Sequence, residues 1–170
     1  YGKRLTNERD GVFGIGLSNS LWWTLPFFYG YGATFLSEDG KHCLLNSQEA
    51  VDAFQLKVDL YRRHRVEGGA WRSGGIVHDQ GFQSGKYAMI LNGPWAVESL
   101  KKTGIDFGVG LVPAGPAGTH TNVGGNDLVV FASTKSPKLA GGFLMFVASE
   151  EMPRMWATRL GQIPVNVKAA

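Results

Sequence analysis

The sequence predicts an α/β fold, because short apolar runs bounded by turn residues alternate with longer segments of helical periodicity. The clearest strand signal lies in residues 82–95, FQSGKYAMILNGPW, where an apolar run ends at the turn residues 92–94 and Trp95 follows at once. The clearest helix signal is the spacing of four apolar residues within 47–65, namely Val51, Phe54, Val58 and Tyr61. A chain of 170 residues is long enough to bury both kinds of element in a real core.

The other elements follow from the same signals. Strands are predicted at 12–17, 87–91, 107–112 and 128–132. Helices are predicted at 47–65, 97–102, 137–148 and 150–160. Asn46 precedes the first of these helices as an N-cap, and the glycine pair 68–69 is expected to end it. Pro26 argues against an uninterrupted helix through the aromatic segment 19–32, although a helix can start at a proline.

The composition is that of a globular protein with a mild positive charge. Hydrophobic residues make up 44% and charged residues 18%, and the formal net charge is +3, so no strongly charged partner is indicated. The basic run 62–65 is interpreted as a solvated helix end and not as a nucleic-acid site, because no aromatic-interleaved basic patch accompanies it. The single cysteine, Cys43, excludes an internal disulfide framework, and its apolar neighbours predict a buried position.

The ends of the chain and its apolar runs bear on its context. No apolar run approaches the length of a membrane span, and no signal peptide is present. The chain begins at Tyr1 and not at a methionine. We therefore expect it to be a piece of a longer precursor.

Motifs for catalysis and for nucleotide binding are missing from the sequence. It contains no G-x-S-x-G elbow, no P-loop and no G-x-G-x-x-G after a strand. A glycosidase needs two carboxylates across a cleft, and such a pair would have to converge from distant positions such as Asp79 and Asp127. The neighbours His78 and Asp79 are interpreted as part of a solvated loop, because no further metal ligand is near. We therefore expect no cofactor and no metal ion.

The stretch around Trp95 carries a family resemblance. Residues 85–97, GKYAMILNGPWAV, resemble the strand-turn-tryptophan signature of the carbohydrate-binding extracellular solute-binding proteins of ABC importers, the maltose-binding-like family. Further segments fall in that family's order: DGVFGIGL (10–17), the aromatic segment 22–29, FLSEDGK (35–41), the helix after Ser47, IDFGVGLVPAG (105–115), GGNDLVVF (124–131) and GQIPVN (161–166). The resemblance therefore covers nearly the whole chain, and the ordered set is more specific than any one piece.

The resemblance implies a periplasmic-binding-protein-like lobe, in which helices flank a mixed sheet, together with part of a second lobe. Residues 1–112 would form the second, C-terminal-type lobe. Residues 113–160 would cross the hinge and supply part of the first lobe, and 161–170 would return through the hinge. Because apolar surfaces of 113–160 would need covering, we expect the chain to self-associate or to pair with a separate chain.

The resemblance also implies aromatic and polar ligand contacts. Sugar rings pack their C–H faces on flat aromatic rings, and their hydroxyl groups need donors and acceptors in fixed positions. Trp95 is the first candidate for a stacking ring. Trp22 is the second, because it lies where the family places a ligand-facing aromatic, and Trp23 is the alternative for that role. Asn19 and Ser20 would bond the sugar hydroxyl groups.

Residues 124–127, Gly-Gly-Asn-Asp, form the third predicted part of the site. The pair Gly124 and Gly125 lets a backbone approach a ligand without interference from a Cβ. Asn126 supplies donors and an acceptor, whereas Asp127 only accepts. In the family a glycine pair at this place lines the cleft, and a plain turn before the strand 128–132 stays open as the other interpretation.

The resemblance implies that the protein binds a sugar or an oligosaccharide in a cleft between two lobes and delivers it to the permease of an ABC importer. It would act in the periplasm or outside the cell and would bind no nucleic acid. It would reach the membrane only through the permease or through a lipid anchor outside this chain. Two alternatives stay open, namely a carbohydrate-active enzyme of the glycoside-hydrolase kind and a protein-interaction module built on the aromatic segment.

Overall fold

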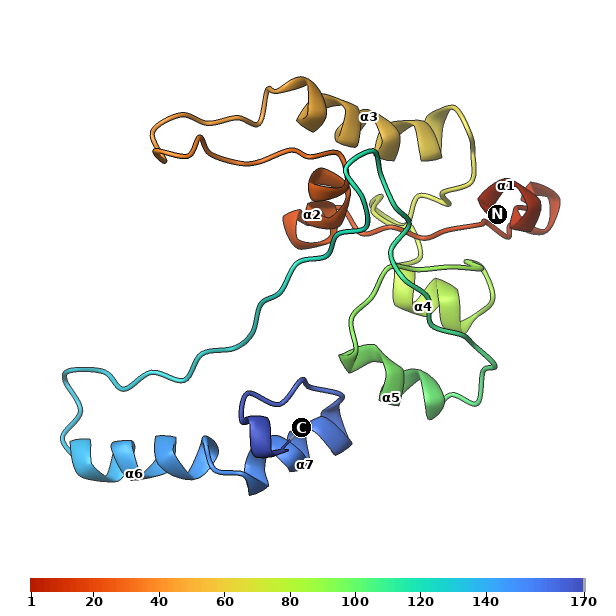
Figure 1. Cartoon of the computed structure of the whole chain (residues 1–170). Helices are drawn as coiled ribbons and strands as arrows, with labels where there is room; N and C mark the ends of the chain where they lie inside the picture. The colour runs from red at the N-terminus through yellow and green to blue at the C-terminus, as the bar shows by residue number, and fades with distance from the viewer. Residues whose placement is uncertain (170) are drawn as a thin grey trace. The chain divides into compact units, whose positions relative to one another are not determined.

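The computed structural model describes residues 1–169 as helices joined by extended segments (Figure 1). The α-helices in this range are α1 (Gly2–Leu5), α2 (Leu21–Gly30), α3 (Gln48–Arg62), α4 (His78–Gln83), α5 (Trp95–Lys101), α6 (Pro137–Val147) and α7 (Glu151–Leu160). Two 3₁₀ helices, η1 and η2, cover Glu8–Asp10 and Val167–Ala169. Within the described residues, no helix has both the length and the apolar character that crossing a bilayer requires.

The chain divides into two compact units. The first contains Tyr1–Leu91 and Phe107–Val123, and the second contains Asn92–Asp106 and Gly124–Ala170. The chain therefore enters the second unit for the turn before α5 and for α5 itself, returns, and leaves again after Val123. The division of 1–112, 113–160 and 161–170 between two lobes stays a prediction.

The core of the first unit lies where α2 packs on α3. Phe28 is fully buried with the α3 residues Ala50 and Ala53. The Phe28 ring stacks on Phe35 with centroids 5.3 Å apart and meets Phe54 edge-on at 4.8 Å. The two alanines allow the helices to approach closely, so one large ring fills the space between them.

The limits of α3 differ from those predicted. Ser47 is the N-cap, because its Oγ accepts a hydrogen bond from the Ala50 N–H at 3.3 Å, and Asn46 lies outside the cap. The helix ends at Arg62, several residues before the glycine pair 68–69. The chain between them turns through Arg65, which has a φ of 53°.

The buried face of α3 was also predicted wrongly. Val51, Phe54 and Val58 are 44–48% exposed, whereas Ala50 and Ala53 are buried. These two sets of residues lie on adjacent faces of the helix. The larger apolar side chains led to the prediction of the wrong face as the buried one. Small residues define the contact face here because only they allow α2 to come close.

Three extended segments of the first unit, 12–17, 66–68 and 86–90, pair in a parallel sense. The bridges join Phe13 with Tyr87, Ile15 with Glu67, and Gly16 with Ile90. The predicted segments 12–17 and 87–91 therefore do pair. Each contact is an isolated bridge, so the predicted mixed sheet is not seen within residues 1–169, and 107–112 forms no bridge there. A sheet needs consecutive bridges, and these segments supply only single ones.

Tyr87 is the central side chain of this paired region. It is 4% exposed, and its hydroxyl donates a 2.7 Å hydrogen bond to the Ile76 carbonyl. A Cβ added at Gly16, Gly68 or Gly81 would lie 2.2–2.5 Å from carbon atoms of the Tyr87 ring. These three glycines are therefore needed for space, because the ring occupies the volume that their side chains would take.

Helix α2 runs through Pro26, which corrects the expectation of an interruption. Proline has no N–H, so the carbonyl of Trp22 loses its usual helical donor four residues on. Pro26 is buried, and its packing in the core outweighs the missing hydrogen bond. The aromatic segment therefore forms one continuous helix that begins after Ser20.

Residues 36–43 form a short hairpin around the turn 37–40. The Gly40 N–H donates to the Ser37 carbonyl at 2.8 Å, and Leu36 and Cys43 form an antiparallel bridge. Cys43 is exposed, so its predicted burial is wrong. A short hairpin has too few neighbouring residues to cover its own apolar positions.

The second unit is built from α5, α6, α7 and η2. Gly161 ends α7 in the left-handed conformation, with φ 63°, directly after the predicted helix end at 160. A Cβ on Gly161 would lie 2.5 Å from the Pro94 carbonyl oxygen, so the end of α7 packs directly on the turn before α5. Ser136 and Pro137 begin α6 as predicted.

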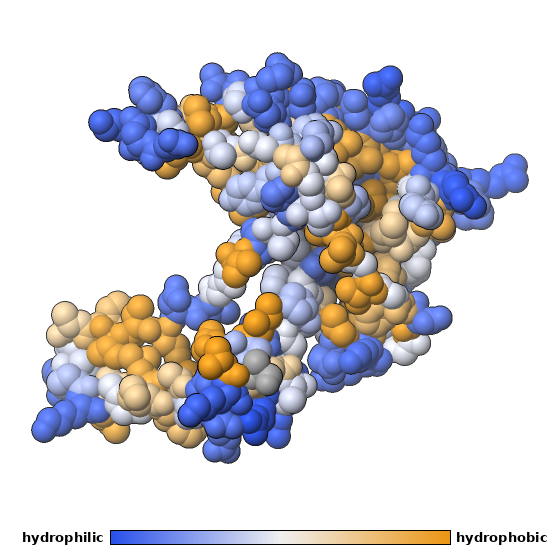
Figure 2. Space-filling view, in the orientation of Figure 1, coloured by the Kyte–Doolittle hydropathy of each residue, from blue (hydrophilic) through white to orange (hydrophobic). Residues whose placement is uncertain are grey.

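Much apolar surface of this unit is exposed. The predicted buried strand 128–132 is unpaired in the described chain, and Leu128 and Phe131 are 52% and 75% exposed. On α6, Leu139 and Met145 are exposed to 76% and 74%. Figure 2 shows hydrophobic colour over the surface of α6. The expectation of burial at 128–132 is therefore wrong for this chain by itself, because none of the described residues covers the segment.

Candidate functional site

The loop that precedes α2 carries two predicted ligand contacts, Asn19 and Ser20, and both are exposed. Ser20 is the N-cap residue of α2, but its hydroxyl makes no capping hydrogen bond. The loop therefore presents a hydroxyl group and a carboxamide to solvent next to an aromatic helix. Groups of this kind can donate to and accept from sugar hydroxyl groups.

A lysine from α3 holds this loop in place. Lys57 Nζ donates to the Ser18 carbonyl at 3.2 Å and to Thr24 Oγ1 at 2.8 Å. The Thr24 hydroxyl in turn donates to the Ser20 carbonyl at 2.9 Å. The ammonium also lies 5.7 Å from the centroid of the Phe27 ring. Loop and helix are therefore joined by one cation that bonds to both.

Burial lowers the pKa of this lysine. The pKa of the Lys57 ammonium lies below its ordinary value because burial removes water from the charged form, while the negative charge of nearby Glu67 opposes the shift. Two hydrogen bonds and the Phe27 ring replace the lost water in the charged form. Sequence reasoning missed Lys57. It lies on the same stripe as Ala50 and Ala53, which would have identified it had the buried face been predicted correctly.

A buried carboxylate anchors the other end of the same loop. Glu67 is 2% exposed and accepts four hydrogen bonds. The donors are the backbone N–H of Leu17 at 3.1 Å, of Gly69 at 2.7 Å and of Ala70 at 3.2 Å, and Trp71 Nε1 at 3.0 Å. A buried carboxylate is tolerated when N–H donors replace its hydration. The sequence signal for this role was weak, namely a glutamate directly before two glycines.

The two predicted rings of α2 differ in their contacts. Trp22 and Trp23 are both half-buried. The Trp23 ring meets the His78 ring edge-on, with centroids 5.7 Å apart. His78 begins α4 and was predicted to lie in a loop, and its Nε2 is 3.6 Å from Asp79 Oδ1. The contact with α4 favours Trp22 over Trp23 as the ring available to a ligand.

Trp95 is the first residue of α5 and is 41% exposed. Its ring lies against Gly93, because a Cβ there would be 2.2–2.5 Å from the ring carbon atoms. Asn92 Oδ1 accepts from the Gly93 N–H at 2.9 Å, which stabilises the turn. The NGPW turn thus holds a partly exposed ring at the start of α5.

Residues 124–127 lie in an extended segment of the second unit. All four are exposed, and a Cβ at Gly125 would meet no atom within 4 Å. Neither Gly124 nor Gly125 has a positive φ, so the backbone here does not require glycine. The role of Asn126 and Asp127 as ligand contacts stays a prediction.

The predicted site residues are divided between the units. Asn19, Ser20, Trp22 and Trp23 belong to the first unit and are gathered at the start of α2, whereas Trp95 and residues 124–127 belong to the second unit. Asp79 and Asp127, named above as a pair that would have to converge for glycoside hydrolysis, are divided in the same way. Within residues 1–169, no group of three or more His, Cys, Asp or Glu side chains is placed to hold a metal ion.

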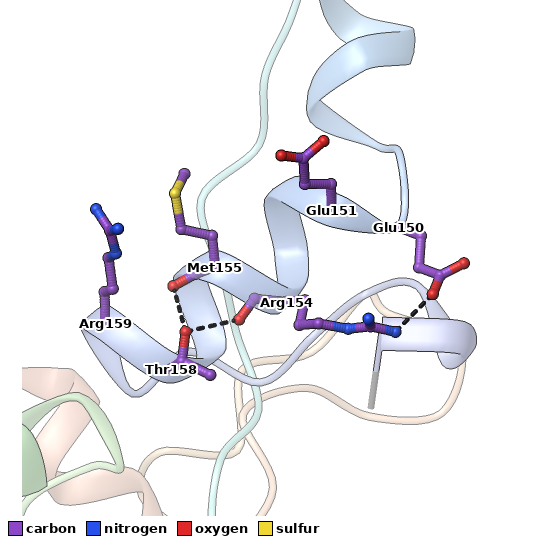
Figure 3. Close-up of a pocket in the computed structure, with 6 residues that line it drawn as sticks. All are labelled: Glu150, Glu151, Arg154, Met155, Thr158 and Arg159. Carbon is purple, nitrogen blue, oxygen red and sulfur yellow. Dashed lines mark hydrogen bonds and ion pairs between the residues drawn. The ribbon is translucent and has the colours of Figure 1, made fainter.

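Two surface hollows involve none of the predicted ligand residues. The first follows one face of α7 and is lined by Glu150, Glu151, Arg154, Met155, Thr158 and Arg159 (Figure 3). In it, Arg154 pairs with Glu150 at 2.5 Å, and the Thr158 hydroxyl donates to the Arg154 carbonyl at 3.1 Å (Figure 3). The second lies beside α1 and contains the Arg65–Glu8 ion pair. A hollow on one charged helix face has no flat ring on which a sugar could stack, so we do not assign the site there.

The sequence of this chain is similar to one family of proteins and to several of its characterised members. The family described as bacterial extracellular solute-binding protein matches residues 2–152. A maltooligosaccharide ABC transporter solute-binding lipoprotein of Streptococcus pneumoniae is 28% identical over 99 residues, which are 57% of this chain and 23% of that protein. The sn-glycerol-3-phosphate-binding periplasmic protein UgpB of Brucella melitensis is 28% identical over 154 residues, which are 87% of this chain and 34% of that protein.

The fold is also similar to that of solved structures. The GacH receptor of Streptomyces glaucescens, whose crystal structures include a complex with acarbose, matches with a TM-score of 0.81 at 28% identity. The match covers 95% of this chain and 43% of the receptor. The chain therefore spans less than half the length of these relatives.

Proposed function

Because this chain belongs to the bacterial extracellular solute-binding protein family, we propose that it is part of a protein that binds a sugar or oligosaccharide and delivers it to an ABC importer. The family binds solutes and is not enzymatic, so the glycoside-hydrolase alternative is set aside. It is an extracellular family, and the relatives include a lipoprotein and a periplasmic protein.

One observation carries the choice of a sugar as the solute. The exposed Asn19–Ser20 loop is held by hydrogen bonds of Lys57 and Glu67 to the backbone directly before it. It leads into Trp22 on α2. A preorganised polar loop beside a flat ring is the combination that carbohydrates require. Relatives that bind maltooligosaccharide or acarbose support the same class of ligand.

In the proposed mechanism, each lobe contributes part of the contacts. The loop, Trp22 and Trp95 would bind from the lobe predicted for residues 1–112, while residues 124–127 would belong to the segment predicted to supply part of the first lobe. Closing around the sugar would shield these contacts from water, and the closed form would be the one presented to the permease.

Isothermal titration calorimetry tests this proposal. The panel would contain maltose, maltotriose, acarbose and sn-glycerol-3-phosphate, with an amino acid as a negative control. This chain would be compared with a version extended by the segments that its relatives carry. Saturable binding of a sugar supports the proposal. Binding of glycerol phosphate alone, or of no compound in the extended version, would overturn it.

A further inference from the structure

Trp71 is exposed, as Trp95 is, but the site described above does not include it. It lies on the loop after Glu67 and is 45% exposed, although tryptophan side chains are usually well buried. Its neighbours 72–77 on the loop are exposed as well. An exposed large ring on a polar loop needs an explanation, because burying it would have stabilised the fold.

The ring is nevertheless held in one orientation. Trp71 Nε1 donates to Glu67 Oε2 at 3.0 Å. The indole also meets the Tyr61 ring edge-on, with centroids 5.3 Å apart and an interplanar angle of 74°. Arg72 Nη1 donates to the Tyr61 hydroxyl at 2.7 Å and so fixes that ring in turn. A ring with a bonded N–H and a packed edge is immobilised before any ligand arrives.

The same carboxylate fixes the position of the predicted sugar loop. Glu67 Oε1 accepts from the Leu17 N–H, the residue directly before Ser18, while Oε2 accepts from Trp71. The Trp71 ring and the start of the 18–20 loop are therefore bound to opposite oxygens of one side chain. Both belong to the first unit, so their proximity does not depend on how the two units are placed.

We propose that Trp71 is an additional sugar-stacking ring beside the Asn19–Ser20 loop, and that Glu67 is the positioning residue that holds ring and loop together. This inference rests on the proposed function, because it assigns a further contact to the same ligand. A ring on this side would extend the site along an oligosaccharide, so it would matter more for a trisaccharide than for a single sugar unit. Glu67 itself is buried and would not touch the ligand.

Nuclear magnetic resonance on this chain provides the test. The indole N–H signal of Trp71 is identified by its loss in Trp71→Phe, and maltotriose and glucose are the probes. In the wild type, this signal should move saturably with maltotriose. Trp71→Ala should weaken maltotriose binding roughly two- to tenfold, the scale of one aromatic contact, with a smaller effect on glucose. Tyr1→Ala removes an aromatic ring that is 92% exposed and serves as the control with unchanged binding.

Glu67→Gln tests the positioning role. It replaces one acceptor oxygen by an NH₂ group that cannot accept from the indole. The Trp71 indole signal should shift and exchange faster with water, and maltotriose binding should weaken at least as much as in Trp71→Phe. Because Glu67→Gln removes a buried contact and is at risk of not folding, the two Trp71 variants, which change an exposed ring, carry the test alone in that case.

The outcomes separate this inference from the proposed function. If Trp71→Ala binds maltotriose with the affinity of the wild type, the ring only anchors the loop. That result would overturn the inference, while the proposed function would stand. If the wild type binds none of the sugars, as this chain and in extended form, the proposed function fails and the inference fails with it. An unmoved indole signal in a folded Glu67→Gln variant would remove Glu67 from its positioning role.

Discussion

At the scale of single residues, Trp95 depends on a neighbour that has no side chain. Its ring occupies the space beside Gly93 and remains 41% exposed at the start of α5. The position of the ring therefore depends on the turn, so a change in either residue should affect the same contact.

Trp95→Ala should weaken sugar binding by about 1–2 kcal/mol, the scale of one stacking contact with its buried area. The melting temperature should change little, because the ring is partly exposed. Gly93→Ala should also weaken binding, since the new Cβ displaces the ring without deleting it. Calorimetry and thermal unfolding check both variants. A variant Trp95→Ala that unfolds, or that binds sugar as before, would place Trp95 in the core and remove it from the site.

The lowered pKa of Lys57 leads us to expect that the stability of the fold depends on pH. Its folded pKa lies below the ordinary value of 10.5, so the unfolded state binds more protons between the two pKa values. The free energy of unfolding should therefore rise with pH through that window. Below the folded pKa, the lysine is charged in both states and the cost of its burial is present in full.

The measurement compares the wild type with Lys57→Met, which cannot titrate. Urea unfolding measured as the pH rises towards 10.5 should show the wild type gaining stability relative to the variant. Lys3→Met, at an exposed lysine, is the matched control for the loss of one positive charge. A flat difference for Lys57→Met would mean that its pKa is not lowered.

At the scale of elements, helix α4 is fixed by its contact with one ring. Gly81 lies in this helix and is buried against Tyr87, where a Cβ would come within 2.2 Å of two ring carbon atoms. In a solvent-exposed helix the same change from glycine to alanine is favourable. The change from glycine to alanine is therefore expected to alter the free energy of unfolding in opposite directions at two helical glycines of this chain.

Gly81→Ala should destabilise the first unit by about 1–3 kcal/mol, the usual cost of overpacking a core. Gly141→Ala in α6, where a Cβ meets no atom within 4 Å, should stabilise by roughly 0.5–1 kcal/mol through helix propensity. Urea unfolding followed by circular dichroism compares the two. Equal effects of the same sign would contradict the packing of α4 on Tyr87.

At the scale of the whole molecule, uncovered apolar surface is the dominant feature. Leu139, Phe143, Met145 and Phe146 of α6 are 53–76% exposed, and the segment 128–131 adds further apolar side chains. Patches of this kind lead to association in water. The short length of this chain relative to its relatives gives the same expectation.

We therefore expect this chain to self-associate, or to bind a complementary chain when one is supplied. Light scattering should give a mass above that of the monomer and one that rises with concentration. Replacing Phe143 and Met145 by lysine should shift the mass towards the monomer. A monodisperse monomer of the wild type at high concentration would contradict the prediction.

The sequence by itself determined the elements whose signals are local. Pro137 and Gly161 mark the start of α6 and the end of α7, and the turn 92–94 ends the apolar run directly before Trp95, although α5 begins at Trp95 and not at 97 as predicted. The extended conformation of 12–17 and of 87–91 was also predictable, since both are apolar runs between breakers. These features depend on a few neighbouring residues, whose conformational preferences are readable without the rest of the chain.

Only the tertiary structure decided which groups are buried and which polar groups meet. The contact face of α3 is set by how closely α2 can approach, and α2 continues through Pro26 because its packing compensates for one lost hydrogen bond. Lys57 and Glu67 reach the 17–20 loop across 39 and 50 residues of sequence. Burial and long-range hydrogen bonds depend on partners far along the chain, and local periodicity carries no information about those partners.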